Sequence, residues 1–102
     1  MTAQIIDGTA IAQSVRDGVK EKVAARVAAG KSQPALATVL VGERIDSATY
    51  VSMKQKACAE LGMTSYHKPM PADISQDDLE KLIKELNADP KVNGILVQLP
   101  LP

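Results

Sequence analysis

The stretch that decides the fold is residues 35–41, which read Ala35-Leu36-Ala37-Thr38-Val39-Leu40-Val41. Pro34 precedes it, Gly42 follows it, and every residue within it except Thr38 is apolar. A strand with one face in water alternates polar and apolar residues, whereas a continuous apolar run predicts a strand that is buried on both faces. Such strands are typical of parallel sheets, so we expect helices on both sides of this one.

A helix is predicted before this strand. Apolar residues recur at every fourth position there, and we expect the helix to begin after residues 7–9, with Asp7 or Thr9 as its N-cap, and to end near Gly30. The repeating apolar positions are Ile11, Val15, Val19, Val23 and Val27.

After the strand, helices and strands alternate. Residues 48–61 are predicted to form a helix with Ser47 as its N-cap, and residues 64–68 a strand that Pro69 ends. A third helix is predicted to begin at Ser75, in capping-box spacing with an acid three residues later, and residues 94–99 a last strand.

The order of these elements is an N-terminal helix followed by β-α-β-α-β. This order predicts an α/β fold with three layers, in which a parallel sheet with right-handed crossovers lies between helices. Ligands of such sheets bind beyond the carboxyl ends of the strands. Those ends are residues 42–47, 67–70 and 98–102.

Length and composition restrict the function classes. The 102 residues suffice for one small domain, which we expect to span residues 1–102. The formal net charge is zero, which argues against a nucleic-acid binder, and no apolar run approaches the length of a membrane span. The single cysteine excludes an internal disulfide and suits a reducing compartment. The first residues do not resemble a secretory signal, so we expect an intracellular domain.

Two kinds of site are disfavoured by the motifs. A zinc site of the usual type is not expected, because the chain has one histidine and one cysteine and such sites need several of these ligands. The chain contains neither the Gly-x-Gly-x-x-Gly fingerprint nor a phosphate-binding loop that ends in Lys-Ser or Lys-Thr. We therefore expect no metal and no cofactor-binding residue within this chain.

The residues that carry chemistry gather on the helix predicted over 48–61. Tyr50, Lys54, Ala57 and Leu61 fall on one stripe about 60° wide, which Met53 flanks. We expect this stripe to face inward, and an inward lysine must extend to solvent or meet polar partners. Desolvation can let a lysine exchange protons near neutral pH, and a tyrosine ring can stack on an aromatic ligand.

Two further polar residues are candidates for this site. Ser47 lies about 20° from Lys54 around the same helix. Gln98 is the polar side chain at the carboxyl end of the last strand, where its amide could bond the Lys54 amine or a ligand carbonyl.

Ordinary structural roles compete with each of these assignments. A Tyr-x-x-x-Lys pair is common on helix surfaces, and Gln98 alone could be a sheet-edge residue. Ser47 is most simply a helix cap. Cys58 fits a small core residue better than a nucleophile, and His67 fits strand-end packing better than catalysis.

Two long segments resemble one family closely. Residues 41–54, Val-Gly-Glu-Arg-Ile-Asp-Ser-Ala-Thr-Tyr-Val-Ser-Met-Lys, resemble its first signature, and residues 94–102, Gly-Ile-Leu-Val-Gln-Leu-Pro-Leu-Pro, resemble its second. Residues 60–63 and 6–8 also fit. The family is the bifunctional methylenetetrahydrofolate dehydrogenase/methenyltetrahydrofolate cyclohydrolases. Many members carry Asp-Pro-Ala-Ser where this chain has Arg-Ile-Asp-Ser at 44–47, a form more similar to eukaryotic members, including the domain of the trifunctional one-carbon synthase.

The resemblance implies a role for each candidate. Lys54 would be the catalytic lysine of the cyclohydrolase reaction, Tyr50 would stack on the folate ring system, and Gln98 would hydrogen-bond Lys54 and tune its protonation. Ser47 would support Lys54, and Leu99 and Pro100 would bind the folate. The implied reactions are oxidation of 5,10-methylene-tetrahydrofolate to the methenyl form, with NADP or NAD as cofactor, and hydrolysis to 10-formyl-tetrahydrofolate.

The resemblance also implies a larger protein. Members of the family are much longer and continue to a conserved aspartate and a nucleotide-binding domain, so we expect a truncated catalytic domain that lacks the NADP-binding part. The family implies a homodimer, a place in one-carbon metabolism and purine biosynthesis, and a cytoplasmic location, although mitochondrial members exist. The alternatives are a folate-binding remnant without catalysis and an unrelated α/β substrate domain of the shikimate-dehydrogenase type.

Overall fold

The apolar stretch forms β1 (Ala35–Val41), the central strand of a parallel sheet in the computed structural model, which describes residues 2–102. It pairs with β2 (Thr64–Met70) on one side and with β3 (Gly94–Val97) on the other, giving the strand order β2-β1-β3. Three helices accompany the strands: α1 (Gly8–Ala28), α2 (Ile45–Leu61) and α3 (Gln76–Ala88). The predicted α/β fold and its parallel β-α-β-α-β order are confirmed.

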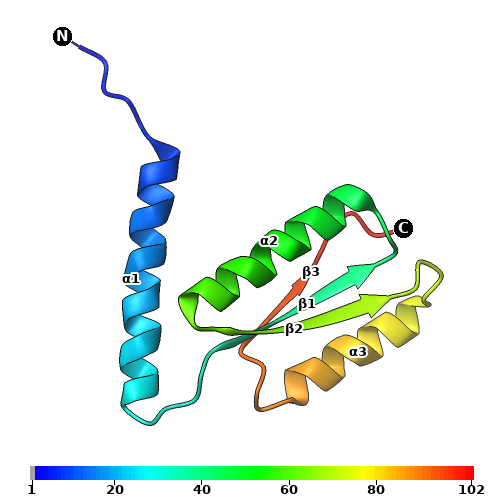
Figure 1. Cartoon of the computed structure of the whole chain (residues 1–102). Coiled ribbons are helices and arrows are strands. Elements are labelled where there is room, and N and C mark those ends of the chain that lie inside the picture. Colours follow the sequence, from blue (N-terminus) through cyan, green and yellow to red (C-terminus); the bar gives the residue numbers. More distant parts are fainter. Residues whose placement is uncertain (1) are drawn as a thin grey trace.

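Helices cover both faces of the sheet (Figure 1). On one face, Ala37, Val39 and Val41 of β1 are buried in a cluster with Leu86 of α3. Because side chains alternate along a strand, Thr38 and Leu40 point to the opposite face, which α2 covers. The two-sided burial that the sequence predicts for β1 is therefore present. Tyr66, Met70, Ile74, Leu79, Leu82, Val92, Ile95 and Val97 pack around the cluster on the α3 face.

Two helix starts differ in detail from the sequence prediction. In α1 the Asp7 carboxylate caps the helix by accepting the Ala10 N–H at 3.2 Å, which confirms the Asp7 alternative, and the helix begins at Gly8 and not after Thr9. Helix α2 begins at Ile45, three residues before the predicted start, and Ser47 lies in its first turn instead of capping it. Asp46 permits the earlier start, because its Oδ1 accepts the Ser47 N–H at 2.9 Å.

The ends of two strands also differ from the prediction. β2 continues through Pro69 to Met70. This is tolerated because the alternating hydrogen bonds, from Thr64 N to Pro34 O and from Gly42 N to Met70 O, leave the Pro69 nitrogen on the outer edge of an edge strand. β3 ends at Val97, two residues early, although the Gln98 N–H still donates to Val39 O at 2.9 Å.

Helix α1 is the least embedded element. It contacts α2 near the carboxyl ends of both helices, where Val23 is buried, and its other end projects beyond the body of the molecule (Figure 1). Ile11 and Val15 are exposed, so only part of its apolar stripe is covered. No helix within residues 2–102 combines the length and apolarity that a membrane crossing needs.

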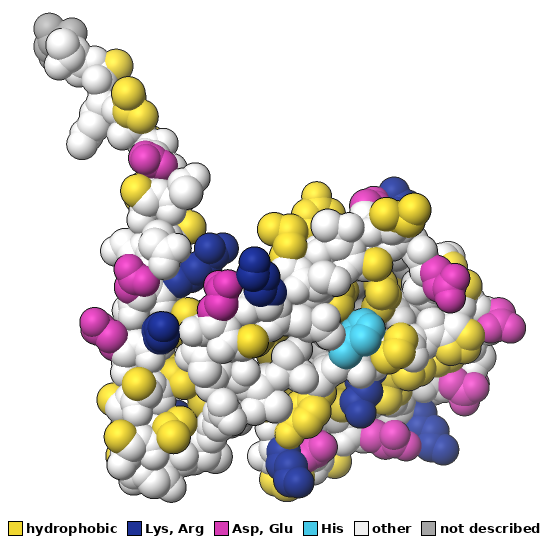
Figure 2. Space-filling view, in the orientation of Figure 1, with side chains coloured by type: hydrophobic (Ala, Val, Ile, Leu, Met, Phe, Trp, Pro, Cys, Tyr) yellow, Lys and Arg dark blue, Asp and Glu magenta, His cyan; other side chains and the backbone are white. Residues whose placement is uncertain are grey.

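Charged side chains of both signs are mixed on the surface. Figure 2 shows Lys or Arg next to Asp or Glu on both the helical arm and the body, and hydrophobic side chains between them. The described residues contain no group of three or more His, Cys, Asp or Glu side chains that could hold a metal ion.

Candidate functional site

Helix α2 places Lys54 at the edge of its buried face. Ser47, Val51 and Cys58 are the buried residues of this helix, and together with Lys54 they span about 60° around its axis. Lys54 itself is half-buried. The prediction that Tyr50 and Lys54 share an inward stripe is wrong for Tyr50, because the inward face is rotated toward Ser47 and Val51.

A hydrogen bond joins Lys54 to the end of β3. Lys54 Nζ donates to Gln98 Oε1 at 2.6 Å in a half-buried setting. The amide of Gln98 is turned this way by its other end, since Nε2 donates to Leu99 O at 3.0 Å. The backbone of Gln98 is fixed to β1 through Val39 O, so the acceptor that faces the amine is held by the sheet.

Tyr50 lies one turn before Lys54 on the solvent side. The side chain of Tyr50 is 55% exposed, and that of Met53, on the same flank, is 61% exposed. An exposed phenol offers an apolar ring face together with a hydroxyl, which suits stacking on an aromatic ligand. The structure thus places Tyr50 one turn from Lys54 on the exposed side of α2.

The segment after Gln98 lies beyond the carboxyl end of β3. Leu99 and Pro100 are exposed, and the peptide bond between them is cis. They follow Gln98 directly, beyond the carboxyl end of β3, where ligands of parallel sheets bind. Both predicted folate-binding positions therefore lie on the ligand edge of the sheet.

Ser47 is on the Lys54 face of α2 but not in contact range. It is buried, with 2% of its surface exposed. Seven residues separate it from Lys54, which is about 10 Å along a helix axis, so the two side chains are too far apart for a direct hydrogen bond. Any support that Ser47 gives Lys54 is exerted through the packing of α2 on the sheet.

Cys58 and His67 stay outside the site. Cys58 is a buried core residue, as its ordinary interpretation predicts, and burial raises the pKa of its thiol, which disfavours the nucleophilic thiolate. His67 is exposed on β2, which β1 separates from β3 and its Gln98. Neither residue joins Lys54.

Sequence reasoning missed an ion pair at the start of α2. Arg44 Nε lies 2.6 Å from Asp46 Oδ1, and both side chains are exposed. The hydrogen bond from Arg44 lowers the pKa of Asp46, and the same bond raises the pKa of Arg44. The available signal was an acid two residues after an arginine at a helix start, where a carboxylate also favours the helix dipole.

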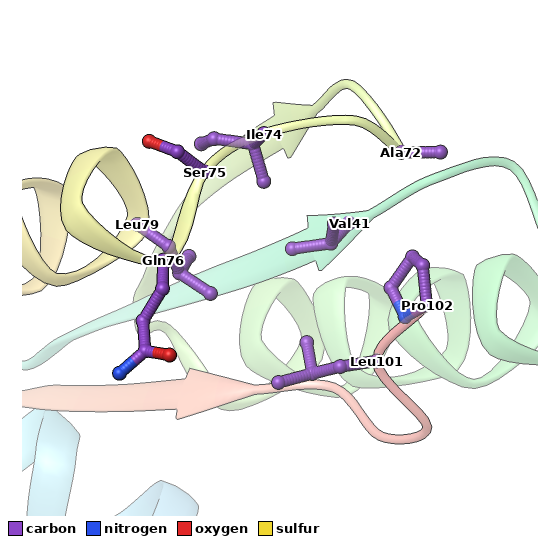
Figure 3. A pocket seen from close by; sticks show the side chains of 8 residues that line it. All are labelled: Val41, Ala72, Ile74, Ser75, Gln76, Leu79, Leu101 and Pro102. Carbon is purple, nitrogen blue, oxygen red and sulfur yellow. The ribbon is translucent and has the colours of Figure 1, made fainter.

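A separate cavity lies on the other face of the sheet. It has a volume of about 280 Å³ and opens between β1, the start of α3 and the segment after β3 (Figure 3). Neither Tyr50, Lys54 nor Gln98 lines it. The candidate site is not in this cavity, because the Lys54–Gln98 pair lies on the α2 face of the sheet. The cavity is lined by Val41, Ala72, Ile74, Ser75, Gln76, Leu79, Leu101 and Pro102.

Known proteins are similar to this chain in sequence and in fold. The family model for the tetrahydrofolate dehydrogenase/cyclohydrolase catalytic domain matches residues 6–102. A bifunctional FolD methylenetetrahydrofolate dehydrogenase/cyclohydrolase from Campylobacter jejuni is 43% identical with a TM-score of 0.90, over 94% of this chain and 34% of that one.

Two further solved structures of folate dehydrogenases are similar to this chain. The Trypanosoma brucei dehydrogenase-cyclohydrolase, in complex with NADP and an inhibitor, is 38% identical with a TM-score of 0.89, over 100% of this chain and 35% of that one. A 5,10-methylenetetrahydrofolate dehydrogenase from the silkworm Bombyx mori is 37% identical with a TM-score of 0.94, over 99% and 35%. The chain therefore spans about a third of the length of these structures. By sequence and by fold, it belongs to the tetrahydrofolate dehydrogenase/cyclohydrolase family and matches the catalytic domain.

Proposed function

We propose that this chain supplies the folate-binding and proton-transferring part of an enzyme of one-carbon metabolism. The enzyme would oxidise 5,10-methylene-tetrahydrofolate to the 5,10-methenyl form with NADP and hydrolyse that product to 10-formyl-tetrahydrofolate. The observation that carries the proposal is the hydrogen bond from Lys54 Nζ to Gln98 Oε1, at the ligand edge of a domain of this family.

The hydrolytic step assigns a task to Lys54. The methenyl carbon is bonded to two nitrogens and carries positive charge, so water can add to it without a covalent intermediate on the protein. Water loses one proton as it adds to that carbon, and the hydroxyl of the adduct loses the second as the formyl C=O forms. A folate nitrogen gains one proton as its bond to that carbon breaks, so the reaction releases one proton to solvent overall. A single amine at this position can accept the first proton and deliver it to the leaving nitrogen.

Gln98 positions the amine for this exchange. Its carbonyl oxygen accepts one N–H of Lys54, which leaves the remaining positions on Nζ for water and folate. Tyr50 would hold the folate by stacking on its rings, and Leu99 and Pro100 would contact the folate from the segment after β3. Ser47 would keep the first turn of α2 against the sheet, so that Lys54 stays in register with Gln98.

Hydride transfer is not assigned to residues of this chain. NADP would accept the hydride from the methylene carbon when it is bound, but the sequence offers no dinucleotide fingerprint. The dehydrogenase half of the proposal is supported by the relatives, of which the Trypanosoma brucei enzyme is in complex with NADP.

A second candidate function is folate binding without catalysis. The observation that favours it is the openness of the site, because Tyr50 and Leu99 are both more than half exposed. Water exclusion strengthens proton transfer and electrostatic catalysis, so an open site is expected to bind better than it reacts.

Replacement of Lys54 tests the proposed role and separates the two candidates. In Lys54→Met the exchangeable proton is lost, and hydrolysis of 5,10-methenyl-tetrahydrofolate, followed by its absorbance and corrected for the uncatalysed rate, should fall by about 100-fold or more. Lys56→Met is the matched control, since this exposed lysine lies on the other side of α2 and should leave the rate unchanged.

The possible results have different meanings. Unchanged hydrolysis in Lys54→Met would overturn the role of Lys54 in proton transfer. A wild-type chain that binds reduced folate in calorimetry but never exceeds the uncatalysed rate would establish the second candidate.

A further inference from the structure

Asn93 bonds the first residue of β1 at two points. Its side-chain Oδ1 accepts the Ala35 N–H at 2.9 Å, and its own N–H donates to the Ala35 carbonyl oxygen at 3.0 Å. Ala35 is buried, with 3% of its surface exposed, and lies 58 positions from Asn93 in the chain. Both backbone polar groups of Ala35 are therefore bonded by one residue, which directly precedes β3.

The Asn93 side chain acts where the backbone before it has left the sheet. The preceding residues form a turn, in which the Val92 N–H donates to Asp89 O at 3.2 Å and the Lys91 N–H donates to the Asp89 carboxylate at 2.9 Å. The Ala35 N–H meets a side-chain oxygen there and not a backbone carbonyl. A buried N–H without an acceptor is costly, so this side chain stabilises the pairing at the start of β3.

The apolar side chains of β3 do not select its register by themselves. Ile95 and Val97 pack against the cluster on the α3 face, and Leu96, between them, points to the α2 face. In a register shifted by one residue, each face would exchange one apolar side chain for another. The polar residues at the two ends, Asn93 and Gln98, distinguish the observed register from a shifted one.

The register of β3 also sets the partner of Lys54. β3 has four residues, and Asn93 and Gln98 bond β1 on either side of it. The Gln98 side chain faces Lys54 in the observed register alone, because side chains alternate along a strand. Five residues of a strand span about 16 Å, so Asn93 acts on this pair from a distance.

We propose that Asn93 is a positioning residue for the Lys54 site, which holds Gln98 Oε1 in front of Lys54 Nζ by fixing the start of β3 on β1. The inference rests on the proposed function, because that function uses the Lys54–Gln98 pair. Asn93 lies at the amino end of β3, whereas the site lies at its carboxyl end, so Asn93 touches neither the folate nor the reacting atoms.

Nuclear magnetic resonance can detect the position of Gln98 without any turnover. In the wild-type chain, a nuclear Overhauser effect should join the Lys54 ε-methylene protons to the Gln98 side-chain amide protons, because the two groups are hydrogen-bonded. This signal should disappear in Asn93→Ala and persist in Asn93→Asp, whose carboxylate can still accept the Ala35 N–H. If Asn93→Ala does not fold, Asn93→Gln takes its place, since its acceptor is displaced by one methylene group.

Hydrolysis of 5,10-methenyl-tetrahydrofolate measures the consequence for the reaction. In Asn93→Ala the rate at saturating substrate should fall by about tenfold, because a misplaced catalytic group loses its alignment with the substrate. KM should change little, since Asn93 does not touch the folate. Asn93→Asp should restore the rate to within about twofold of the wild type. Asn87→Ala removes an exposed asparagine side chain from α3 and is the matched control, with both constants unchanged.

The outcomes keep this inference and the proposed function apart. If the wild-type chain is active and Asn93→Ala keeps either the signal or the rate, or if Asn93→Asp restores neither, the positioning role is wrong and the folate site stands. If the signal is lost in Asn93→Ala and kept in Asn93→Asp while even the wild-type chain never exceeds the uncatalysed rate, the proposed hydrolysis fails and the placement of Gln98 by Asn93 stands.

Discussion

At the residue scale, the defining contact is the one that Gln98 makes with Lys54. Its position could be predicted from the sequence, because the carboxyl ends of parallel strands meet the helix starts at one edge of the sheet. The rotation of α2 could not be predicted, because Tyr50, Met53 and Val51 are all apolar enough to face a core. Packing against β1 selects Val51 and Ser47, and that choice depends on tertiary contacts.

Gln98→Leu should slow the proposed hydrolysis of 5,10-methenyl-tetrahydrofolate. The substitution removes the oxygen that accepts the Lys54 N–H at 2.6 Å, so the amine is no longer held at the edge of the sheet. We expect the rate, followed by absorbance, to fall by about tenfold or more, because a misplaced catalytic group loses its alignment with the substrate. Gln76→Leu, on α3 at the other face of the sheet, is the control; equal rates for both variants would contradict the positioning role.

Thr38→Val should not destabilise the fold. Thr38 is completely buried on β1, and within the described residues its Oγ1 has no hydrogen-bond partner. An unpaired buried hydroxyl costs roughly 1–3 kcal/mol, so its removal should be neutral or raise the free energy of unfolding by about 1 kcal/mol. Urea denaturation measures the change. A loss of stability would show that the hydroxyl has a partner, such as a buried water.

At the scale of elements, the central strand and the three helices follow from local sequence, whereas several ends do not. The burial of β1 could be predicted, because both of its faces are covered and its sequence is therefore apolar throughout except at Thr38. Pro69 would end a central strand, and its place inside β2 depends on which edge of the sheet that strand occupies. Ser47 fits an N-cap by residue type, but the Asp46 carboxylate accepts the Ser47 N–H, so α2 begins a turn earlier.

Ser75→Ala tests the cap of α3. The Ser75 hydroxyl oxygen accepts the Asp78 N–H at 3.1 Å, as the capping motif predicts. Its loss should lower the free energy of unfolding by about 1 kcal/mol, because α3 carries Leu86 of the core. Ser52→Ala, at an exposed position of α2, should have little effect in the same denaturation series. Equal stabilities would mean that solvent replaces the cap.

At the scale of the whole molecule, the described residues bring the candidate site residues together at one edge of the sheet. The sheet, α2 and the loop after β3 present Lys54, Gln98 and Tyr50 at one edge, where Tyr50 and Leu99 are more than half exposed. The motifs predict this arrangement, since both signatures of the family are present in the chain and the Gly-x-Gly-x-x-Gly fingerprint is not.

This chain by itself should bind folate without reducing NADP. Incubation with 5,10-methylene-tetrahydrofolate and NADP, followed at the absorbance of NADPH, should give no rate above the buffer value. The Campylobacter jejuni relative, of which this chain covers 34%, serves as the positive control in the same assay. Clear turnover by this chain would show that residues 1–102 hold a nucleotide site of an unfamiliar kind.

The hydrogen bond from the Gln98 N–H to Val39 O fixes the alignment of β3 on β1. Side chains alternate along a strand, so a slip of β3 by a single residue would turn Gln98 to the α3 face and leave Lys54 facing an apolar neighbour. The alignment of β3 on β1 therefore determines whether Lys54 keeps its hydrogen-bond partner. A substitution between β1 and β3 that shifts their register would remove the Lys54–Gln98 hydrogen bond, although Lys54, Gln98 and Tyr50 would all be unchanged.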